Sequence, residues 1–153
     1  MTSPVADRAV LDTNVLLAAT DEGRPEHAGA VAALNAWPAS GMVLYTSGQI
    51  LREYLAVATR PIQLAGLGLA RADALTNARA LRAHLTLLAE DARVSERLLQ
   101  LVGEVECAGK QVHDANVVAT MLVHGIESLV TMNLSDFARF EGHVRVLGLP
   151  TAA

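Results

Sequence analysis

Residues 9–17 read Ala-Val-Leu-Asp-Thr-Asn-Val-Leu-Leu, an apolar run that stops abruptly at Asp12. Three other short apolar runs are bounded by glycine or polar residues and separated by helical stretches; they are residues 42–46, 128–132 and 144–147. Short apolar runs of this kind are typical of strands buried in a parallel sheet. The pattern therefore predicts an α/β domain whose first strand, Ala9–Leu11, ends immediately before Asp12.

The segments between these runs have the spacing of helices. We expect helices over Glu26–Trp37, Ser47–Thr59, Ala70–His84, Asp91–Cys107 and Asp114–Val123. Pro61, Gly66 and Gly68 predict a loop after the second of these helices, because proline and glycine interrupt regular structure. The chain contains no repeat and no linker, so residues 1–153 are expected to form a single domain.

The composition indicates one compact domain with a substantial core. Of the 153 residues, 52% are hydrophobic and 18% are charged, which excludes a disordered chain. A single cysteine, Cys107, excludes a disulfide scaffold. No apolar run approaches the ~18 residues of a membrane helix, and the first residues lack the basic and apolar regions of a signal peptide. We therefore expect a cytoplasmic protein that does not enter a membrane.

Three aspartates occupy the ends of predicted elements. Asp12 and Asp136 follow strands, and Asp114 begins a predicted helix at the head of its apolar stripe. Ligands gather at the carboxyl ends of strands in open α/β sheets, so these acids can share one edge. Each aspartate alone is equally well explained as a helix cap.

A fourth acid, Glu53, lies inside a predicted helix. Its neighbours at helical spacing are Ile50, Tyr54 and Val57, so the carboxylate lies on a largely apolar face. A buried carboxylate needs a cation or a hydrogen-bond donor. A salt bridge to an arginine such as Arg52 or Arg60 is one explanation; a shared functional site is the other.

If the four acids gather, their mutual repulsion must be offset. Carboxylates that lie close together raise one another's pKa, and divalent cations allow them to remain ionised together. A site built from oxygen ligands alone favours hard ions, Mg²⁺ or Mn²⁺, over zinc. The four acids also account for the whole formal net charge of −4, so the rest of the chain is balanced. The acidic balance therefore does not argue against an RNA substrate.

The motifs around these acids occur in a familiar order. Leu11–Leu16, Glu53, Val112–Ala119 and Thr131–Phe137 together resemble the PIN domain, and most of all the VapC-like toxins of bacterial toxin–antitoxin pairs. The resemblance covers nearly the whole chain. It implies a three-layer α/β/α fold with a short, mostly parallel central sheet surrounded by helices.

The resemblance also implies an activity, a Mg²⁺- or Mn²⁺-dependent endoribonuclease. Asp12, Glu53, Asp114 and Asp136 match the catalytic, metal-binding acids. The first three are expected to hold one ion directly or through water, and Asp136 to serve a second site or an outer shell. Thr13 and Asn133 match polar residues that support the acids through hydrogen bonds, and Asn14 matches a structural position.

Further implications concern partners. VapC-like toxins commonly form homodimers and are blocked by a small antitoxin. The chain departs from the pattern in an extension before its first strand and in the Pro61–Ala70 loop, and these departures bear on substrate choice and partner docking. His113, beside Asp114, has no catalytic role in the family and is expected to be structural or capping.

Five basic residues are candidates for binding RNA or an acidic partner. Three arginines fall on one side of the Ala70–His84 helix, and two cations flank the acid-bearing segments; the five are Arg52, Arg71, Arg79, Arg82 and Lys110. A solvated basic face is the alternative explanation for each of them.

Two other functions fit parts of the pattern. A strand-end aspartate also serves phosphoryl-transfer enzymes, although these commonly carry an Asp-x-Asp pair, and here Thr13 and Asn14 follow Asp12. A non-catalytic PIN-like binding module is the other alternative, and the presence of all four acids disfavours it.

Overall fold

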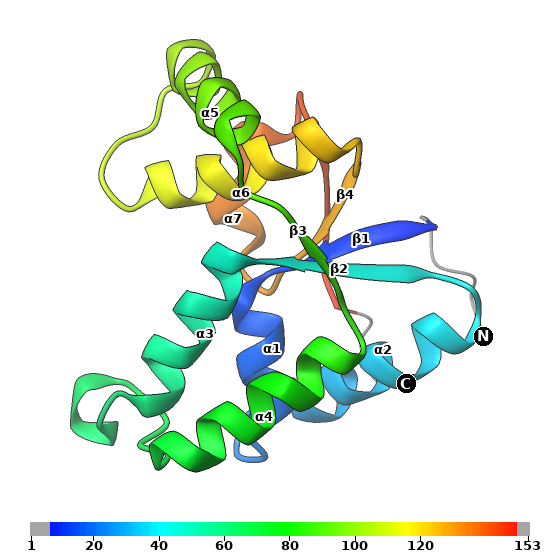
Figure 1. The fold of residues 1–153 in the computed structure, drawn as a ribbon, viewed down its shortest axis with the longest axis vertical. Coiled ribbons are helices and arrows are strands. Elements are labelled where there is room, and N and C mark those ends of the chain that lie inside the picture. Colours follow the sequence, from blue (N-terminus) through cyan, green and yellow to red (C-terminus); the bar gives the residue numbers. More distant parts are fainter. Residues whose placement is uncertain (1–6, 150–153) are drawn as a thin grey trace.

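The computed structural model describes residues 7–149, and these form a five-stranded sheet with helices on both sides (Figure 1). The sheet order is β3-β2-β1-β4-β5. All four strand pairings are parallel, so the described sheet is wholly rather than mostly parallel. The strands are β1 (Arg8–Leu11), β2 (Val43–Ser47), β3 (Thr86–Leu88), β4 (Ser128–Val130) and β5 (Arg145–Leu147).

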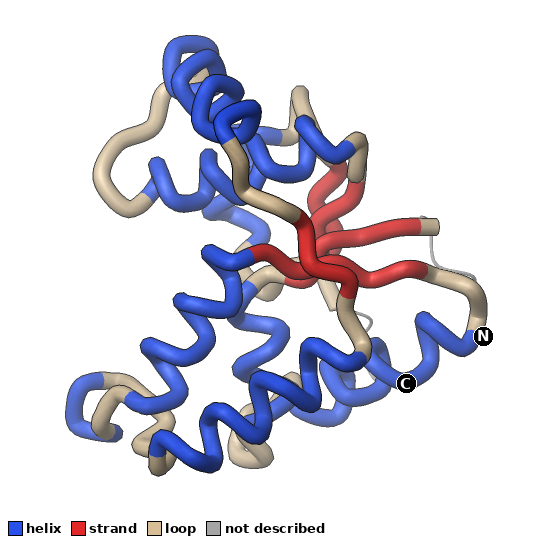
Figure 2. The backbone as a smooth tube through the Cα atoms, in the orientation of Figure 1, coloured by secondary structure: helices blue, strands red, loops and turns tan. Residues whose placement is uncertain are grey.

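Two groups of helices enclose the sheet, and together they complete the predicted three-layer α/β/α fold (Figures 1 and 2). The first group lies below the sheet in Figure 1 and comprises α1 (Thr13–Thr20), α2 (His27–Ala39), α3 (Gly48–Thr59) and α4 (Arg71–Ala83). The second group lies above it and comprises α5 (Ala92–Glu104), α6 (Gln111–His124) and α7 (Leu134–Phe137). Two short 3₁₀ turns are η1 (Ile62–Leu64) and η2 (Ala138–Phe140).

The strand order reverses direction beside β1. Strands β2 and β3 follow on one side of β1, whereas β4 and β5 lie on the other. Since crossovers between parallel strands are right-handed, this reversal sends the connecting helices to opposite faces of the sheet. It also opens a crevice beyond the carboxyl ends of β1 and β4, the usual ligand site of such sheets.

The central strand β1 explains why the opening stretch is so apolar. Ala9, Val10 and Leu11 are buried, because β1 has a strand on each side and a helical layer on each face. Asp12 is the first polar residue after this run, and it lies at the mouth of the crevice.

Several elements were not predicted from the sequence; they are α1, β3, the short α7 and the two 3₁₀ turns. Helix α1 follows β1 with a single residue between them, and its central residues 15–18 are buried, so it lacks the one-sided apolar period of a surface helix. Strand β3 has three residues, of which only Leu88 is buried, so it carries no apolar run.

Some predicted helix ends were wrong. The helix expected over Asp91–Cys107 ends at Glu104, and Asp114 lies within the first turn of α6 rather than opening that helix. Gly109 has a φ of 59° and ends the preceding loop, so the helix begins at Gln111 without an aspartate cap.

In the described part of the chain, no helix is long and apolar enough to cross a membrane. Most of the predicted N-terminal extension, and the last residues of the predicted single domain, lie outside residues 7–149.

Candidate active site

Asp12 lies directly after β1 and is 9% exposed. Its Oδ1 accepts a hydrogen bond from the Thr13 backbone N–H at 2.8 Å, so it caps helix α1. Its Oδ2 accepts from the Thr131 hydroxyl at 2.8 Å and from the Asn14 amide at 3.2 Å. Asp12 is therefore a helix cap, and it also lies at the carboxyl end of β1.

Thr131 and Asn14 join the ends of β1 and β4. The Thr131 hydroxyl, which is fully buried, accepts from the Asn14 amide at 3.2 Å and from the Asn133 backbone N–H at 3.0 Å. Asn14 Oδ1 accepts from the Met132 backbone N–H at 3.1 Å. Asn133 thus contributes through its backbone, and Thr131 makes the bond to the acid that was expected of Asn133.

Glu53 reaches the same crevice from helix α3. Its Oε1 accepts a hydrogen bond from the Thr13 hydroxyl at 3.0 Å, so Thr13 supports an acid as predicted by the resemblance. The alternative of a salt bridge does not apply in residues 7–149. Arg52 instead lies 3.9 Å from Glu90, and Arg60 forms no ion pair.

The four acids influence one another electrostatically. Burial, followed by the charges of the other three acids, raises the pKa of Asp114 to about 6, and Arg139 opposes this rise; the three acids are Asp12, Asp136 and Glu53. Burial also raises the pKa of Asp12, against the hydrogen bonds from Thr131 and Thr13. The fold has brought together four carboxylates that are far apart in the sequence.

Three of the acids line one pocket of about 340 Å³. Its wall includes Asp12, Glu53 and Asp114 together with the side chains of α1 and α3 that face them; the remaining lining residues are Thr13, Asn14, Leu17, Ala56, Val57, Arg60 and Asn133. Asp136 lies outside this wall, although its charge contributes to the raised pKa values of both Asp12 and Asp114.

The donor set of this pocket fits a hard divalent cation. Its oxygen ligands are carboxylates, and their mutual repulsion is unrelieved by any ion pair in the described chain. Among residues 7–149, no three His, Cys, Asp or Glu side chains are grouped closely enough to enclose an ion by themselves. The two findings are compatible, because Mg²⁺ usually retains several waters and is held by one or two carboxylates.

Arg60 is the guanidinium in the pocket wall, and sequence reasoning did not propose it as a substrate contact. It caps the end of α3, where the following loop folds back onto the helix. Gly68 N–H donates to the Arg60 carbonyl oxygen at 2.8 Å, and a Cβ on Gly66 would lie 2.0 Å from that oxygen. This close approach requires glycine at position 66 and fixes Arg60 at the pocket.

The five predicted basic contacts lie outside the pocket wall. Arg52 is 71% exposed at its side chain and faces Glu90. The others are exposed on α4 or before α6; they are Arg71, Arg79, Arg82 and Lys110. They can contact a long substrate or a partner only at a distance from the acids.

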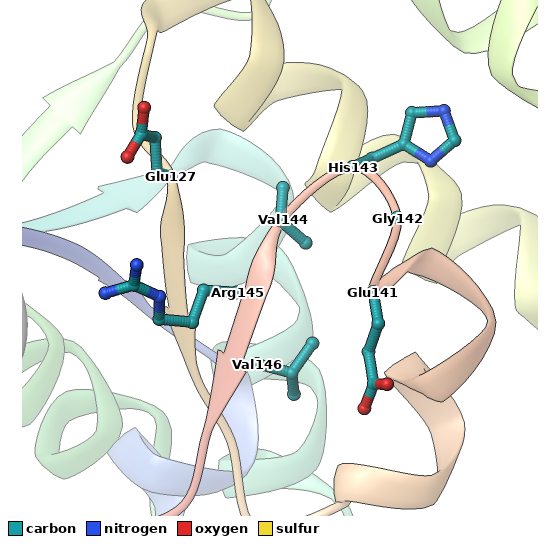
Figure 3. Close-up of a pocket in the computed structure, with 7 residues that line it drawn as sticks. All are labelled: Glu127, Glu141, Gly142, His143, Val144, Arg145 and Val146. Atoms are coloured by element: carbon teal, nitrogen blue, oxygen red, sulfur yellow. The ribbon is translucent and has the colours of Figure 1, made fainter.

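A second hollow of about 490 Å³ lies along β5 (Figure 3). Its acids, Glu127 and Glu141, lie on opposite sides of the strand and do not converge. His143 is engaged with Glu104, with Nε2 3.0 Å from Oε2. This hollow lacks the converging groups of the acidic pocket.

The chain is an α/β/α protein with a wholly parallel sheet and carboxylates where the strand order reverses, which agrees with the PIN-domain fold that the sequence resemblance implied. The family match then identifies it: the PIN domain model matches residues 9–142, and the chain belongs to this family. No curated protein sequence matches the chain.

Solved structures share the fold at low sequence identity. VapBC2 from Rickettsia felis, bound to a DNA fragment from its promoter, matches with a TM-score of 0.69 and 16% identity over 94% of this chain and 99% of the other. FitAB bound to an IR36 DNA fragment gives 0.59 and 19%, over 95% and 99%. FitAcB from Neisseria gonorrhoeae gives 0.56 and 19%, over 91% and 96%.

Proposed function

We propose that this PIN domain is a metal-dependent endoribonuclease and the toxin of a toxin–antitoxin pair. The observation that carries the proposal is the cluster of four carboxylates at the reversal point of the sheet, with Asp114 raised to a pKa of about 6. Repulsion of this kind, which Arg139 offsets only in part, is a cost to the fold, and it is typical of functional sites.

Asp12, Glu53 and Asp114 are the residues that would hold a Mg²⁺ or Mn²⁺ ion, with Asp136 serving a second ion or the outer shell. A bound divalent ion lowers the pKa of water and neutralises charge on a phosphate. Thr131 and Thr13 keep Asp12 ionised, since their hydrogen bonds favour the charged form. Thr13 also orients Glu53.

Arg60 supplies the positive charge that a phosphodiester needs in an acidic pocket. It shares the wall with Asp12, Glu53 and Asp114, and it has no side-chain partner among the described residues. A planar guanidinium binds phosphate oxygens in pairs, so it can hold the backbone of RNA beside the acids.

The residues after Asp12 disfavour a phosphoryl-transfer enzyme. Such enzymes commonly carry an Asp-x-Asp pair after the first strand, and here Thr13 and Asn14 follow Asp12. Asn14 donates a hydrogen bond to Asp12 Oδ2 and so helps to position this carboxylate. We therefore place Asp12 in ion binding.

The activity is tested by incubating the purified chain with cellular RNA in Mn²⁺ or Mg²⁺ and mapping new RNA ends. We expect cleavage that EDTA abolishes and that Asp114→Asn lacks. The matched control is Asp73→Asn, an exposed acid in the first turn of α4, which keeps wild-type cleavage. Equal cleavage by Asp114→Asn, or cleavage in EDTA, contradicts the proposal.

The solved relatives VapBC2 and FitAB support the toxin role, since each is a two-component assembly bound to DNA. We propose that this chain is likewise paired with a small antitoxin that inhibits it, and that it forms a homodimer, as its family implies. Co-expression with the protein encoded beside it should yield a stable complex without nuclease activity. A complex that cleaves RNA as fast as the free chain would refute the antitoxin role.

A further inference from the structure

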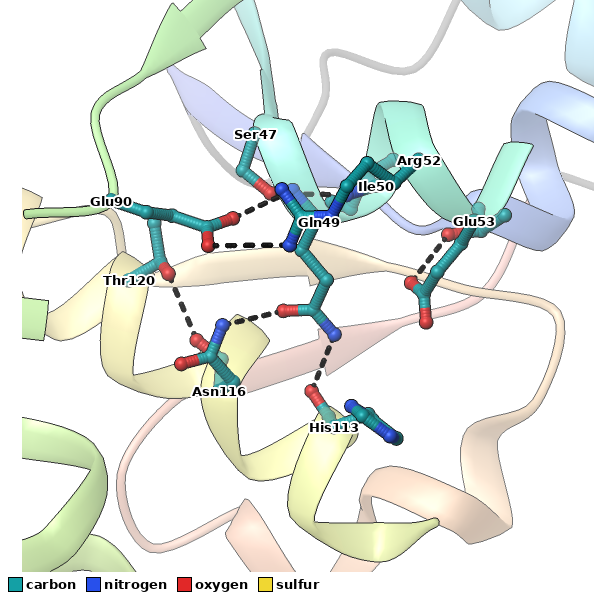
Figure 4. Close-up of polar contacts among 10 residues, drawn as sticks. Ser47, Gln49, Ile50, Arg52, Glu53, Glu90, His113, Asn116 and Thr120 are labelled. Carbon is teal, nitrogen blue, oxygen red and sulfur yellow. Dashed lines mark hydrogen bonds and ion pairs between the residues drawn. The ribbon is translucent and has the colours of Figure 1, made fainter. Parts of the chain in front are cut away.

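Gln49 joins the two helices that carry acids on opposite sides of the pocket (Figure 4). It lies in the first turn of α3 and is 5% exposed. Its side-chain Nε2 donates to the His113 carbonyl oxygen of α6 at 2.8 Å, and its Oε1 accepts from the Asn116 amide of α6 at 2.7 Å. Both the N–H donor and the oxygen acceptor of the side-chain amide are therefore engaged with α6.

The position of this bridge relates directly to the acids. Gln49 precedes Glu53 by four residues, which is one turn of the same helix. His113 and Asn116 lie on either side of Asp114. One side chain thus ties the turn that bears Asp114 to the helix that bears Glu53.

The α3 end of the bridge is itself anchored. On α3, the Gln49 backbone N–H donates to Glu90 Oε1 at 2.7 Å, and Ser47 caps the helix by accepting from the Ile50 N–H at 3.3 Å. Figure 4 shows these contacts beside the two hydrogen bonds of the Gln49 side chain.

No other side chain in the described part of the chain joins α3 to α6 by a hydrogen bond. Within residues 7–149, every hydrogen bond between α3 and α6 passes through the Gln49 side chain. The two helices lie on opposite sides of the sheet, and no backbone hydrogen bond in residues 7–149 joins one helix to the other. Repulsion between Glu53 and Asp114 acts to separate them.

We propose that Gln49 is a positioning residue, which sets the spacing between Glu53 and Asp114 and so prepares the pocket for a divalent cation. This role rests on the proposed function for its consequence in metal binding. The bridge itself is a property of the metal-free chain, and it can be tested separately.

The principal test measures Mn²⁺ affinity by calorimetry, without RNA. Gln49→Met conserves the length of the side chain but removes both hydrogen bonds to α6. Because residues that orient metal ligands commonly contribute 10- to 100-fold to affinity, we expect a loss of about 10-fold. Asn116→Leu removes one of the two bonds and is expected to lose less.

A double variant shows whether the two residues act through the same bridge. If they do, Gln49→Met with Asn116→Leu loses no more Mn²⁺ affinity than Gln49→Met alone. Losses that multiply would show that Asn116 acts independently, and they would overturn the shared bridge.

Thr120→Val is the matched control for helix damage. Thr120 is 2% exposed, lies on α6 and makes one hydrogen bond, which stays within that helix. We expect its melting temperature to fall while its Mn²⁺ affinity remains within twofold of wild type. If Gln49→Met also keeps wild-type affinity, the positioning role is wrong.

Amide hydrogen exchange of the metal-free proteins separates this proposal from the proposed function. We expect faster exchange in the first turn of α6 in Gln49→Met, and no change there in Thr120→Val. A wild-type chain that binds no Mn²⁺ would refute the metal-dependent function, whereas unchanged exchange in Gln49→Met would refute the bridge.

Discussion

The two sides of the acidic pocket are built differently. On the strand side, Asp12 receives three hydrogen bonds, from Thr13, Asn14 and Thr131. On the helix side, Asp114 receives none among residues 7–149, and its pKa rises to about 6. The carboxylate on the strand side is held by hydrogen bonds, whereas the carboxylate on the helix side retains an electrostatic cost that a cation can relieve.

The largest effect should come from removing the unsatisfied acid. Asp114→Asn keeps the shape of the side chain and removes its charge. A metal site provides several kcal/mol of charge stabilisation, so we expect RNA cleavage to fall by about 10² or more. Single-turnover cleavage rates measure this, with circular dichroism to verify the fold. A fall of less than threefold would mean that the helix side is not part of the reaction.

The strand side should respond through stability. Thr131→Val conserves shape but removes one of the two hydrogen bonds to Asp12 Oδ2 and leaves the Asn133 N–H without its acceptor. Such losses cost about 1–3 kcal/mol, which urea denaturation can measure. Thr131→Ser retains the hydroxyl and is expected to remain close to wild type. Equal stability of the valine and serine variants would show that the hydroxyl network does not hold the strand side together.

The pH dependence of stability distinguishes the two sides further. Because the folded pKa of Asp114 lies above its ordinary value, its ionisation opposes folding above pH 6, and this penalty disappears as the pH falls below about 4. The metal-free Asp114→Asn protein should therefore melt at a higher temperature than wild type at pH 7.5 and at the same temperature at pH 4. Partial exposure makes the difference small.

Thermal scans at both pH values, with and without Mg²⁺, provide the measurement. Mg²⁺ should stabilise the wild type and narrow its difference from Asp114→Asn at pH 7.5. If Asp114→Asn melts at a lower temperature than wild type at pH 7.5, the carboxylate stabilises the fold and the comparison fails.

The smallest effect concerns Arg60 at the pocket rim. Arg60→Ala should weaken the binding of single-stranded RNA to the inactive Asp114→Asn protein and reduce the slope of log affinity against log salt by about 1. Fluorescence anisotropy at several salt concentrations measures both. Arg79→Ala, an exposed arginine on α4 away from the pocket, is the control. An equal change in slope for both variants would assign Arg60 to the general surface charge.

The sequence allowed the four acids and the layers of the fold to be predicted, because both are marked locally. A strand-end aspartate such as Asp12 interrupts an apolar run, and the ordered motifs around Glu53 and Asp114 match a family. The strand order was not predicted, since a short buried run carries no information about which strands pair with it.

The supporting residues escaped prediction because their partners are distant in sequence. Thr131 resembles any β-branched strand residue until its hydroxyl is placed beside Asp12, and Gln49 resembles a surface glutamine until α6 covers it. Arg60 was considered only as a salt-bridge partner for Glu53. Its place in the pocket depends on the loop that folds back at Gly66.

The bond between Thr131 and Asp12 also sets an order in time. It joins residues 119 positions apart, so the strand side cannot be completed until most of the chain has left the ribosome. Contacts of such separation form late in folding, after local helices and turns. A nascent chain that already carries Asp12, Glu53 and Asp114 therefore has these acids without the assembled pocket. The pocket is completed only when β4 has been synthesised and has paired with β1.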